Sequence, residues 1–412
     1  MNILFLTENF PPETNAAATR VYERAVYWAE WGHDVTVITC APNFPHGKLF
    51  DGYANRWRQV EDMDGIRVVR VKTYIAANRG VVRRTLDFLS FLATGTIGAL
   101  REPKPDVVTA TSPQFFAAVA GWLVGLLKRR PFVFELGDLW PVSIEAVGAM
   151  KRGPAIRTLE KLELFLYRRS AAVIALTHSF EQNLTSRGIA PGKISVIVNG
   201  VDASRYQPRD RDQELAREWG LAGKFVVGYV GTHGMAHGLG NVLDAAELLA
   251  DADGIRLFLA GAGAERDALI EDANRRGLKN VVFIPPQPKS EMPRIWSLCD
   301  IALVHLKNNP VFAGVIPSKI FEAMAMGLPI LLAAPGGEAT AIVEDNGAGI
   351  SVPAEDPAAL AAAARRLAAG EQERMGLARA ALRASERYSR ERQAAEVLEV
   401  YRAVGASGPN GR

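Results

Sequence analysis

The stretch Lys224-Phe225-Val226-Val227-Gly228-Tyr229-Val230-Gly231-Thr232-His233-Gly234 decides the fold, because it repeats in mid-chain what the N-terminus begins. Its apolar part has the length of a strand, and a glycine-containing turn then leads into a helical pattern over about 241–250. The chain opens in the same way, with a strand predicted at 3–7 and a helix whose apolar face carries Val21, Ala25 and Trp28. The sequence therefore predicts two similar α/β halves.

Apolar runs of strand length alternate with helical patterns along the whole chain, which is typical of parallel sheets built from βαβ units. Further strands are expected at 35–39, 66–71, 107–110, 132–135, 173–176, 194–198, 256–260, 281–284, 301–304, 329–332 and 349–352. A polar linker near 200–210 separates the two halves, and the tail 405–412 looks disordered. A ligand is expected at the carboxyl ends of the strands, in a cleft between two doubly wound lobes.

Composition excludes several classes of protein. The chain has 412 residues, and its 48 basic and 45 acidic residues give a net charge of +3, so duplex nucleic acid is not an expected partner. Cys40 and Cys299 lie far apart and outside any Cys-x-x-Cys pair, which favours a reducing cytoplasm over a disulfide scaffold or zinc site. No signal peptide is expected, and the longest apolar run, 115–127, is shorter than the roughly 20 residues that cross a bilayer.

The segment Pro317–Ile330 carries the most chemistry. Proline at its start and Gly-Leu-Pro near its end predict a short helix. Amides near Ser318 and the charge of Lys319 are expected to hold a phosphate, and Glu322, one turn on, to accept hydrogen bonds from ribose hydroxyls. The alternative is that Lys319 and Glu322 form an ordinary solvated helix face.

This segment, together with 336–339 and 347–350, resembles the donor-binding region of the family 4 glycosyltransferases. The stretches Glu8–Arg20 and Cys40–Pro45 resemble a subgroup that builds bacterial O-antigen, capsule and exopolysaccharide, including L-fucosamine-transferase-like members. The resemblance covers essentially the whole chain.

The resemblance implies the GT-B fold, an α/β architecture in which two Rossmann-like, doubly wound parallel-sheet lobes face each other across a cleft. It places the acceptor-binding lobe at 1–203 and the nucleotide-sugar-binding lobe at 204–388. A C-terminal helix within 389–412 is expected to pack back toward the first lobe. Retention of the anomeric configuration is implied, with no metal and no cofactor besides the nucleotide sugar as co-substrate.

Two departures from the family pattern concern the diphosphate. Gly314 stands where the family usually has a glutamate, and the Gly-Arg-x-x-x-x-Lys-Gly clamp corresponds to 231–238, which has neither cation. The leaving diphosphate must therefore be stabilised by other groups. The candidates are Lys307, Lys319, His233, and the backbone amides of Gly231, Thr232 and Gly234. Lys307 is equally consistent with an ordinary surface lysine, and His237 is interpreted as a helix-start or surface histidine.

Candidates in the first lobe follow predicted strands. Asp138 comes after the strand at 132–135 and is the predicted catalytic residue, although it would equally cap the next helix. Asn15 and Ala16 are expected in a phosphate or acceptor loop before a helix starting near Thr19. Arg20 is expected to contact the donor phosphate or the acceptor, with a helix-surface arginine as the alternative.

Other motifs are given ordinary roles. The Asp-x-Asp pairs at 62–64, 210–212 and 251–253 do not follow a strand into a cleft loop, so no metal site is predicted, and Asp64-Gly65 indicates a turn. The segment 261–266 lacks the third glycine of a dinucleotide fingerprint and is interpreted as a strand-to-helix turn.

Basic residues lie beside two apolar segments. Arg79, Arg83 and Arg84 precede apolar residues at 86–92, and 128–130 is basic after the run at 115–127. Contact with an anionic membrane surface is expected for the first segment, whereas packing on the sheet is favoured for 115–127.

The predicted function is transfer of a sugar from a UDP-linked donor, an N-acetylated hexosamine being one candidate, to a lipid-linked or glycan acceptor of surface-polysaccharide synthesis. Two alternatives remain open: a nucleotide-sugar 2-epimerase and a non-catalytic UDP-binding subunit of an assembly complex. The expected location is the cytoplasm, with peripheral contact at the inner membrane.

Overall fold

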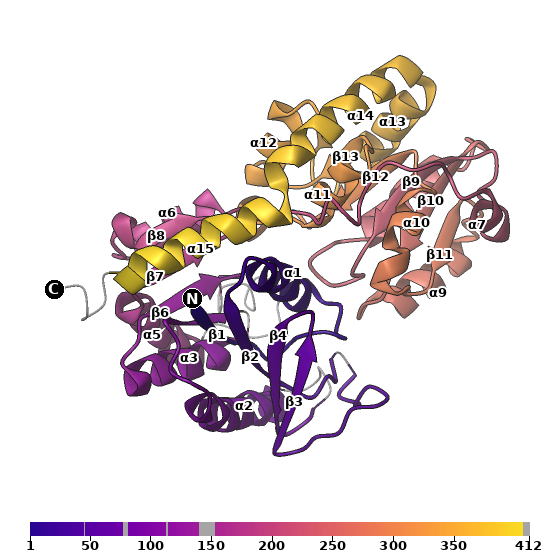
Figure 1. The fold of residues 1–412 in the computed structure, drawn as a ribbon. Coiled ribbons are helices and arrows are strands. Elements are labelled where there is room, and N and C mark those ends of the chain that lie inside the picture. The colour runs from indigo at the N-terminus through magenta and orange to yellow at the C-terminus, as the bar shows by residue number, and fades with distance from the viewer. Residues whose placement is uncertain (45, 77–80, 113, 140–152, 407–412) are drawn as a thin grey trace. The chain divides into compact units, whose positions relative to one another are not determined.

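The computed structural model describes all residues except 45, 77–80, 113, 140–152 and 407–412. The chain divides into two compact units, one formed by Met1–Val198 with Arg390–Arg412 and the other by Asn199–Ser389 (Figure 1). The first crossing between units lies at 198/199, where the sequence placed it at 203/204. Most of the tail expected to be disordered lies outside the described residues.

The first unit contains an eight-stranded sheet in the order β3-β4-β2-β1-β5-β6-β7-β8. Its strands are β1 (Asn2–Leu6), β2 (Asp34–Cys40), β3 (Arg58–Met63), β4 (Ile66–Val71), β5 (Val107–Thr111), β6 (Phe132–Leu136), β7 (Ala172–Ala175) and β8 (Ile194–Val196). Every neighbouring pair is parallel except β3 with β4, which is antiparallel. The predicted parallel strands are all present, with ends shifted by one or two residues.

Strand β3 was not predicted from the sequence. Alternate residues of β3 are exposed, and most of its side chains are polar, so it lacks the apolar run that marks the other strands. Asp64 and Gly65 both have positive φ, 52° and 79°, which is the conformation of a tight two-residue hairpin turn. The predicted turn at Asp64-Gly65 is thus confirmed.

Helices cover both faces of this sheet. They are α1 (Ala16–Glu30), α2 (Val81–Arg101), α3 (Phe115–Lys128), α5 (Pro154–Arg169), α6 (His178–Ser186) and α15 (Arg390–Ala406), with a 3-10 turn η1 (Pro191–Lys193). Phe91 of α2, Phe115 of α3 and Tyr167 of α5 belong to the core on one face. Packing of 115–127 on the sheet, the favoured interpretation of that run, is thereby confirmed.

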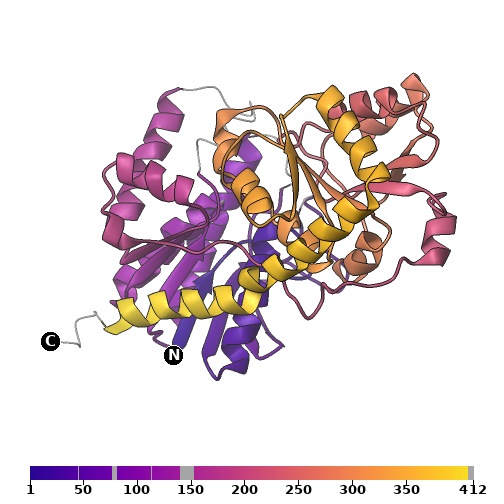
Figure 2. The same ribbon diagram turned by 90° about the horizontal axis from the view of Figure 1, so that it is seen from above.

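The other face is covered by α1 and α15, and Figure 2 shows α15 lying across the strands of this unit. Trp28 Nε1 donates a hydrogen bond to the Ala394 carbonyl over 2.9 Å. The Tyr401 hydroxyl donates to Glu135 Oε1 over 2.6 Å, and the second oxygen of Glu135 pairs with Arg24 at 2.5 Å. The C-terminal helix is therefore part of the core of the first unit.

The second unit has a six-stranded parallel sheet in the order β11-β10-β9-β12-β13-β14. The strands are β9 (Phe225–Val230), β10 (Ile255–Ala260), β11 (Val281–Ile284), β12 (Ile301–His305), β13 (Ile330–Ala333) and β14 (Gly349–Val352). This is the order 3-2-1-4-5-6 of a doubly wound nucleotide-binding fold, and β4-β2-β1-β5-β6-β7 of the first unit repeats it.

The helices of the second unit are α7 (Gln213–Glu218), α8 (Gly240–Leu248), α9 (Arg266–Arg276), α10 (Met292–Trp296), α11 (Lys319–Ala325), α12 (Glu338–Asp345), α13 (Pro357–Ala369) and α14 (Glu371–Ser385). Three 3-10 turns accompany them, η2 (Lys289–Glu291), η3 (Pro310–Gly314) and η4 (Glu386–Tyr388). Within the described ranges, no helix combines the length and apolar character needed to span a membrane.

Candidate active site

The strand order of each unit fixes where a ligand belongs. In a doubly wound sheet, ligands bind at the carboxyl ends of the two strands between which the order reverses. In the second unit these strands are β9 and β12, so the loop with His233 and His237 and the loop with Lys307 start at this point. In the first unit they are β1 and β5, and Ser112 directly follows β5.

The loop after β9 rests on the glycines of the neighbouring turn. A Cβ atom on Gly261 would lie 2.0 Å from the Gly231 carbonyl oxygen, and one on Gly263 would lie 2.2 Å from the His233 carbonyl oxygen. The segment 261–266 is a strand-to-helix turn, as predicted. Its glycines are needed because the two loop backbones touch.

Lys319 is buried beneath the β9 loop. Its side chain begins α11 but is only 8% exposed, and its Nζ lies 3.6 Å from the ring centroid of Tyr229. Nζ has no hydrogen-bond partner within the part of the chain that the structure describes. Burial lowers the pKa of Lys319 to about 7, and its low exposure shows that the alternative of a solvated helix face is wrong for Lys319.

Two histidines lie around the same tyrosine. The ring of His233 is 5.8 Å from that of Tyr229, and the ring of His237 is 5.9 Å from it. Burial, followed by the charge of Lys319, lowers the pKa of His233 to about 4 and that of His237 to about 3. The interpretation of His237 as a helix-start or surface histidine is wrong, because α8 begins at Gly240 and the His237 ring is partly buried.

Hydrogen bonds hold the loops after β9 and β12 together. His305 Nδ1 lies 2.6 Å from the His237 carbonyl oxygen, and His305 Nε2 lies 3.1 Å from Asn241 Oδ1. The Lys307 amide donates to the Ala236 carbonyl over 3.0 Å. Lys307 therefore belongs to this loop cluster as a backbone partner.

The remaining donor-side candidates are placed around α11 and the loop. Ser318 precedes α11 and makes no side-chain cap there, and Glu322 Oε2 accepts a hydrogen bond from Trp296 Nε1 over 3.1 Å. Thr232 is exposed, and its carbonyl accepts from the Tyr229 hydroxyl over 2.7 Å.

In the first unit, Arg20 lies beneath the loop that carries Asp138. Arg20 Nη2 donates to Thr111 Oγ1 over 2.8 Å, and a Cβ atom on Gly137 would lie 2.6 Å from Nη2. Arg20 is 6% exposed, so the helix-surface interpretation is wrong, and burial lowers its pKa to about 10. Ser112 Oγ accepts from the amides of Gly137 and Asp138 over 2.9 and 3.2 Å. Whether Asp138 caps a following helix concerns residues outside the described ranges.

Asn15 and Ala16 do not form the predicted loop. The helix expected near Thr19 begins at Ala16, and the Asn15 side chain caps it by accepting from the Ala18 amide over 3.0 Å. Ala17 and Ala18 are buried in the first turn. An asparagine before a run of alanines is a helix-start signal that the sequence contained and the prediction overlooked.

Carboxylates missed by the sequence prediction organise the edge after β1. Glu13 accepts from the Asn43 amide over 2.7 Å and from the Phe44 amide over 2.8 Å, which joins the two stretches that carried the subgroup resemblance. Glu8 is buried, and Glu8 Oε1 has no partner in the described part of the chain. Burial and the nearby Asp87 raise the pKa of Glu8 well above its usual value.

The Asp-x-Asp pairs have structural roles. Asp212 caps α7 and pairs with Arg294 at 2.5 Å, and Asp251 pairs with Arg365. Over the described residues, no three His, Cys, Asp or Glu side chains gather as a metal-binding group.

Comparison with known proteins identifies the family. Residues 15–200 match the family described as glycosyl transferase 4-like domain, and residues 211–383 match glycosyl transferases group 1. The chain is 33% identical over 318 residues to the D-inositol 3-phosphate glycosyltransferase of Salinispora arenicola, covering 72% of this chain and 69% of that protein. It belongs to the family 4 glycosyltransferases.

Two further relatives extend this assignment. The glycosyltransferase is 26% identical over 337 residues to the putative colanic acid biosynthesis glycosyl transferase WcaI of Escherichia coli K12, covering 79% of this chain and 82% of WcaI. The structure of the Anabaena protein Alr3699/HepE in complex with UDP matches with a TM-score of 0.71 at 21% identity, over 98% of this chain and all of that one. The predicted GT-B fold is thereby confirmed.

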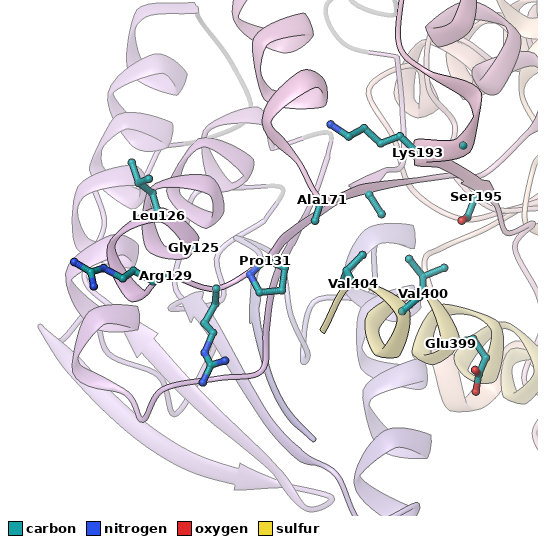
Figure 3. A pocket seen from close by; sticks show the side chains of 14 residues that line it. Gly125, Leu126, Arg129, Pro131, Ala171, Lys193, Ser195, Glu399, Val400 and Val404 are labelled. Atoms are coloured by element: carbon teal, nitrogen blue, oxygen red, sulfur yellow. The ribbon is translucent and has the colours of Figure 1, made fainter. Parts of the chain in front are cut away.

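The glycosyltransferase also has a pocket of about 770 Å³ at the opposite edge of the first sheet (Figure 3). Pro131, Ala171 and Lys193 line it just before β6, β7 and β8, and Val400 and Val404 of α15 close it. None of the predicted site residues lines this pocket.

Proposed function

We propose that this glycosyltransferase transfers a sugar from a UDP-linked donor to a lipid-linked intermediate of a surface polysaccharide. The observation that carries the proposal is the buried Nζ of Lys319, which has no hydrogen-bond partner among the described residues and lies where the strand order of the second unit reverses. A buried ammonium without a hydrogen-bonded partner is costly, and a diphosphate would supply both negative charge and acceptor oxygens. The same ammonium would stabilise the charge that develops on the leaving diphosphate during transfer.

The other predicted site residues of the second unit take roles around this contact, and those of the first unit are considered for the acceptor. Glu322 is proposed to accept hydrogen bonds from the ribose, and the amides near Ser318 and those of Gly231, Thr232 and Gly234 are proposed to bind the phosphates. Asp138 is proposed to orient an acceptor hydroxyl or exchange its proton, with Arg20 held beneath the neighbouring glycine. We expect retention of the anomeric configuration and no requirement for a metal or cofactor.

The comparisons support the choice of donor and pathway class. The Anabaena structure of the same fold contains UDP, which favours a UDP-linked donor. The relative WcaI is described as a colanic acid biosynthesis enzyme, which favours a polysaccharide product.

An exposed apolar stripe on α2 supports the proposal of a lipid-linked acceptor, because it would hold the enzyme at the membrane that carries such an acceptor. Leu86, Leu89, Ile97 and Leu100 lie on one side of this helix by their spacing and are 39–52% exposed. Arg83 and Arg84 are exposed before the stripe, and Lys128 at its far end donates to the Leu100 carbonyl over 3.3 Å. Arg79, a third member of the predicted basic cluster, lies outside the described residues. An apolar stripe flanked by cations suits the surface of an anionic membrane.

A panel of UDP-, GDP- and dTDP-linked sugars tests the donor by thermal shift, and the best binder then enters a transfer assay with a polyprenyl diphosphate-linked acceptor. We expect a UDP-linked sugar to stabilise the protein and to be consumed only with acceptor present. A preference for a GDP- or dTDP-linked sugar would contradict the proposed uracil base of the donor. Product release without acceptor would favour an epimerase. Absence of both UDP binding and turnover would end the proposal.

A further inference from the structure

Three basic side chains lie around the ring of Tyr229, and each has a buried nitrogen without a hydrogen-bond partner among the described residues. Lys319 Nζ, both ring nitrogens of His233 and Nδ1 of His237 are buried and lack partners among the described residues. Buried polar atoms are nearly always paired, so several unpaired nitrogens at one place indicate a ligand rich in acceptor oxygens. The two rings and the ammonium all lie within 6 Å of the tyrosine ring centroid, close enough to meet one such ligand.

The charges that face this cluster come from several elements. Lys319 and Arg266 face His233, while Lys319, His305 and His233 face His237. The acidic groups act on the neighbours of the two histidines: Glu322 faces Lys319, and Glu355 faces His305. The backbone of Ala260 favours the imidazolium form of His233, and that of His305 favours the imidazolium form of His237. Burial and the facing positive charges outweigh both, so the neutral imidazoles are favoured. The negative charge of a diphosphate would reverse this preference.

We propose that His233 and His237 are titratable phosphate ligands, and that binding of the donor diphosphate over Lys319 draws a proton from solution onto this histidine pair. The inference rests on the proposed function, since the diphosphate is that of the sugar donor. By linkage, donor affinity rises as the pH falls from about 8 to about 6, approaching tenfold per pH unit for uptake of one full proton.

Calorimetry with UDP-glucose and GDP-mannose tests this coupling, because the diphosphate diester of a nucleotide sugar does not titrate in this range. Each titration is run at pH 6.0, 7.0 and 8.0 in two buffers with different ionisation enthalpies. The difference in binding heat between the buffers gives the number of protons taken up. We expect clear uptake at pH 6.0 to 7.0 and tighter binding at the lower pH.

Lys319 is the competing proton acceptor, since its own pKa is about 7. Lys319→Arg keeps a cation that does not titrate, whereas the double variant His233→Gln/His237→Gln keeps Lys319 and removes both imidazoles. At pH 6.0, where Lys319 is already largely protonated, proton uptake should persist in Lys319→Arg and vanish in the double variant. His178→Gln, at an exposed histidine on α6, is the matched control and should retain the uptake of the unaltered protein.

Three results would overturn the inference. Tight binding without proton uptake means that the histidines stay neutral, and uptake lost only in Lys319→Arg assigns the proton to the lysine. Uptake at pH 6.0 that survives in the double variant excludes both histidines. Each of these leaves the proposed function intact, whereas failure of the unaltered protein to bind either nucleotide sugar would count against the proposed function itself.

Discussion

The ammonium nitrogen of Lys319 stands 3.6 Å above the ring of Tyr229, and burial, not an acidic partner, dominates its environment. A buried ammonium lowers the stability of the fold, and it is well placed to bind an anion. The protein retains a costly cation at the point where its ligand is proposed to bind.

Lys319→Met should therefore stabilise the protein while removing nucleotide-sugar binding. Replacing a buried charge by an apolar side chain of similar length should raise the free energy of unfolding by roughly 1–4 kcal/mol at pH 7. The folded pKa of about 7 lies below that of an unfolded lysine, so the unfolded chain holds more protons above pH 7 and the stability of the unaltered protein rises with pH there. Urea unfolding at pH 7 and 9 measures both effects.

The control for that measurement is Lys279→Met, at an exposed lysine of the same unit, which should change stability little. A destabilised Lys319→Met variant would mean that the ammonium supports the fold.

The histidine pair predicts a loss of stability in acid. The folded pKa values of His233 and His237, about 4 and about 3, lie below the ~6.5 of an unfolded histidine. The unfolded chain then binds more protons, so their contribution to stability falls as the pH drops from about 6.5 toward 4. The melting temperature of the unaltered protein should therefore fall relative to that of the double glutamine variant over this window.

Burial raises the pKa of Asp87 to about 7, so Asp87 makes the protein more stable as the pH falls through this window. This contribution is the same in both proteins, so only the difference between their melting temperatures reports on the histidines. A gap between the two melting curves that does not change with pH would contradict the prediction.

Gly261→Ala should displace the loop after β9. The new Cβ would lie 2.0 Å from the Gly231 carbonyl oxygen, and a backbone atom cannot move aside as a flexible side chain can. We expect a loss of roughly 1–3 kcal/mol in stability and weaker nucleotide-sugar binding, measured by unfolding and calorimetry. Gly254→Ala, where a Cβ meets open space, should leave binding unchanged. Equal effects of the two substitutions would argue against a special role for the contact.

The stripe on α2 should bind anionic vesicles. Leu86→Gln/Ile97→Gln removes exposed apolar side chains, so co-sedimentation with phosphatidylglycerol vesicles should drop several-fold while the melting temperature stays nearly constant. Leu248→Gln, at a similarly exposed leucine of the second unit, is the matched control. Unchanged sedimentation of the double variant, or equal binding to neutral phosphatidylcholine, would exclude this surface.

The parallel strands were predictable because most of them are continuous apolar runs buried on both faces, and their alternation with helices indicated the fold class. Strand β3 escaped because an edge strand such as Arg58–Met63 keeps its polar side chains in solvent. The sequence indicated Lys319 from its place in the first turn of a predicted helix and His233 from its place in the turn after a predicted strand. Their relation to Tyr229 was not predictable, because it depends on packing between residues some 90 positions apart.

The buried state of Arg20 was missed for the same reason, since Arg20 is on α1 and its partner Thr111 lies on β5, 91 positions away in the chain. For Lys319, His233 and His237, nothing in the sequence distinguishes a solvated basic side chain from a desolvated one. That difference arises only when the loops after β9 and β12 close over them.

The return of α15 to the first unit has a consequence for synthesis on the ribosome. Trp28 and Tyr401 share one core, although the residues between them include the entire second unit. A nascent chain that ends before residue 390 leaves that apolar face of α1 and the sheet uncovered. The first unit to emerge is therefore the last to be completed, and fragments ending near residue 198 should aggregate unless the missing helix is supplied as a separate peptide.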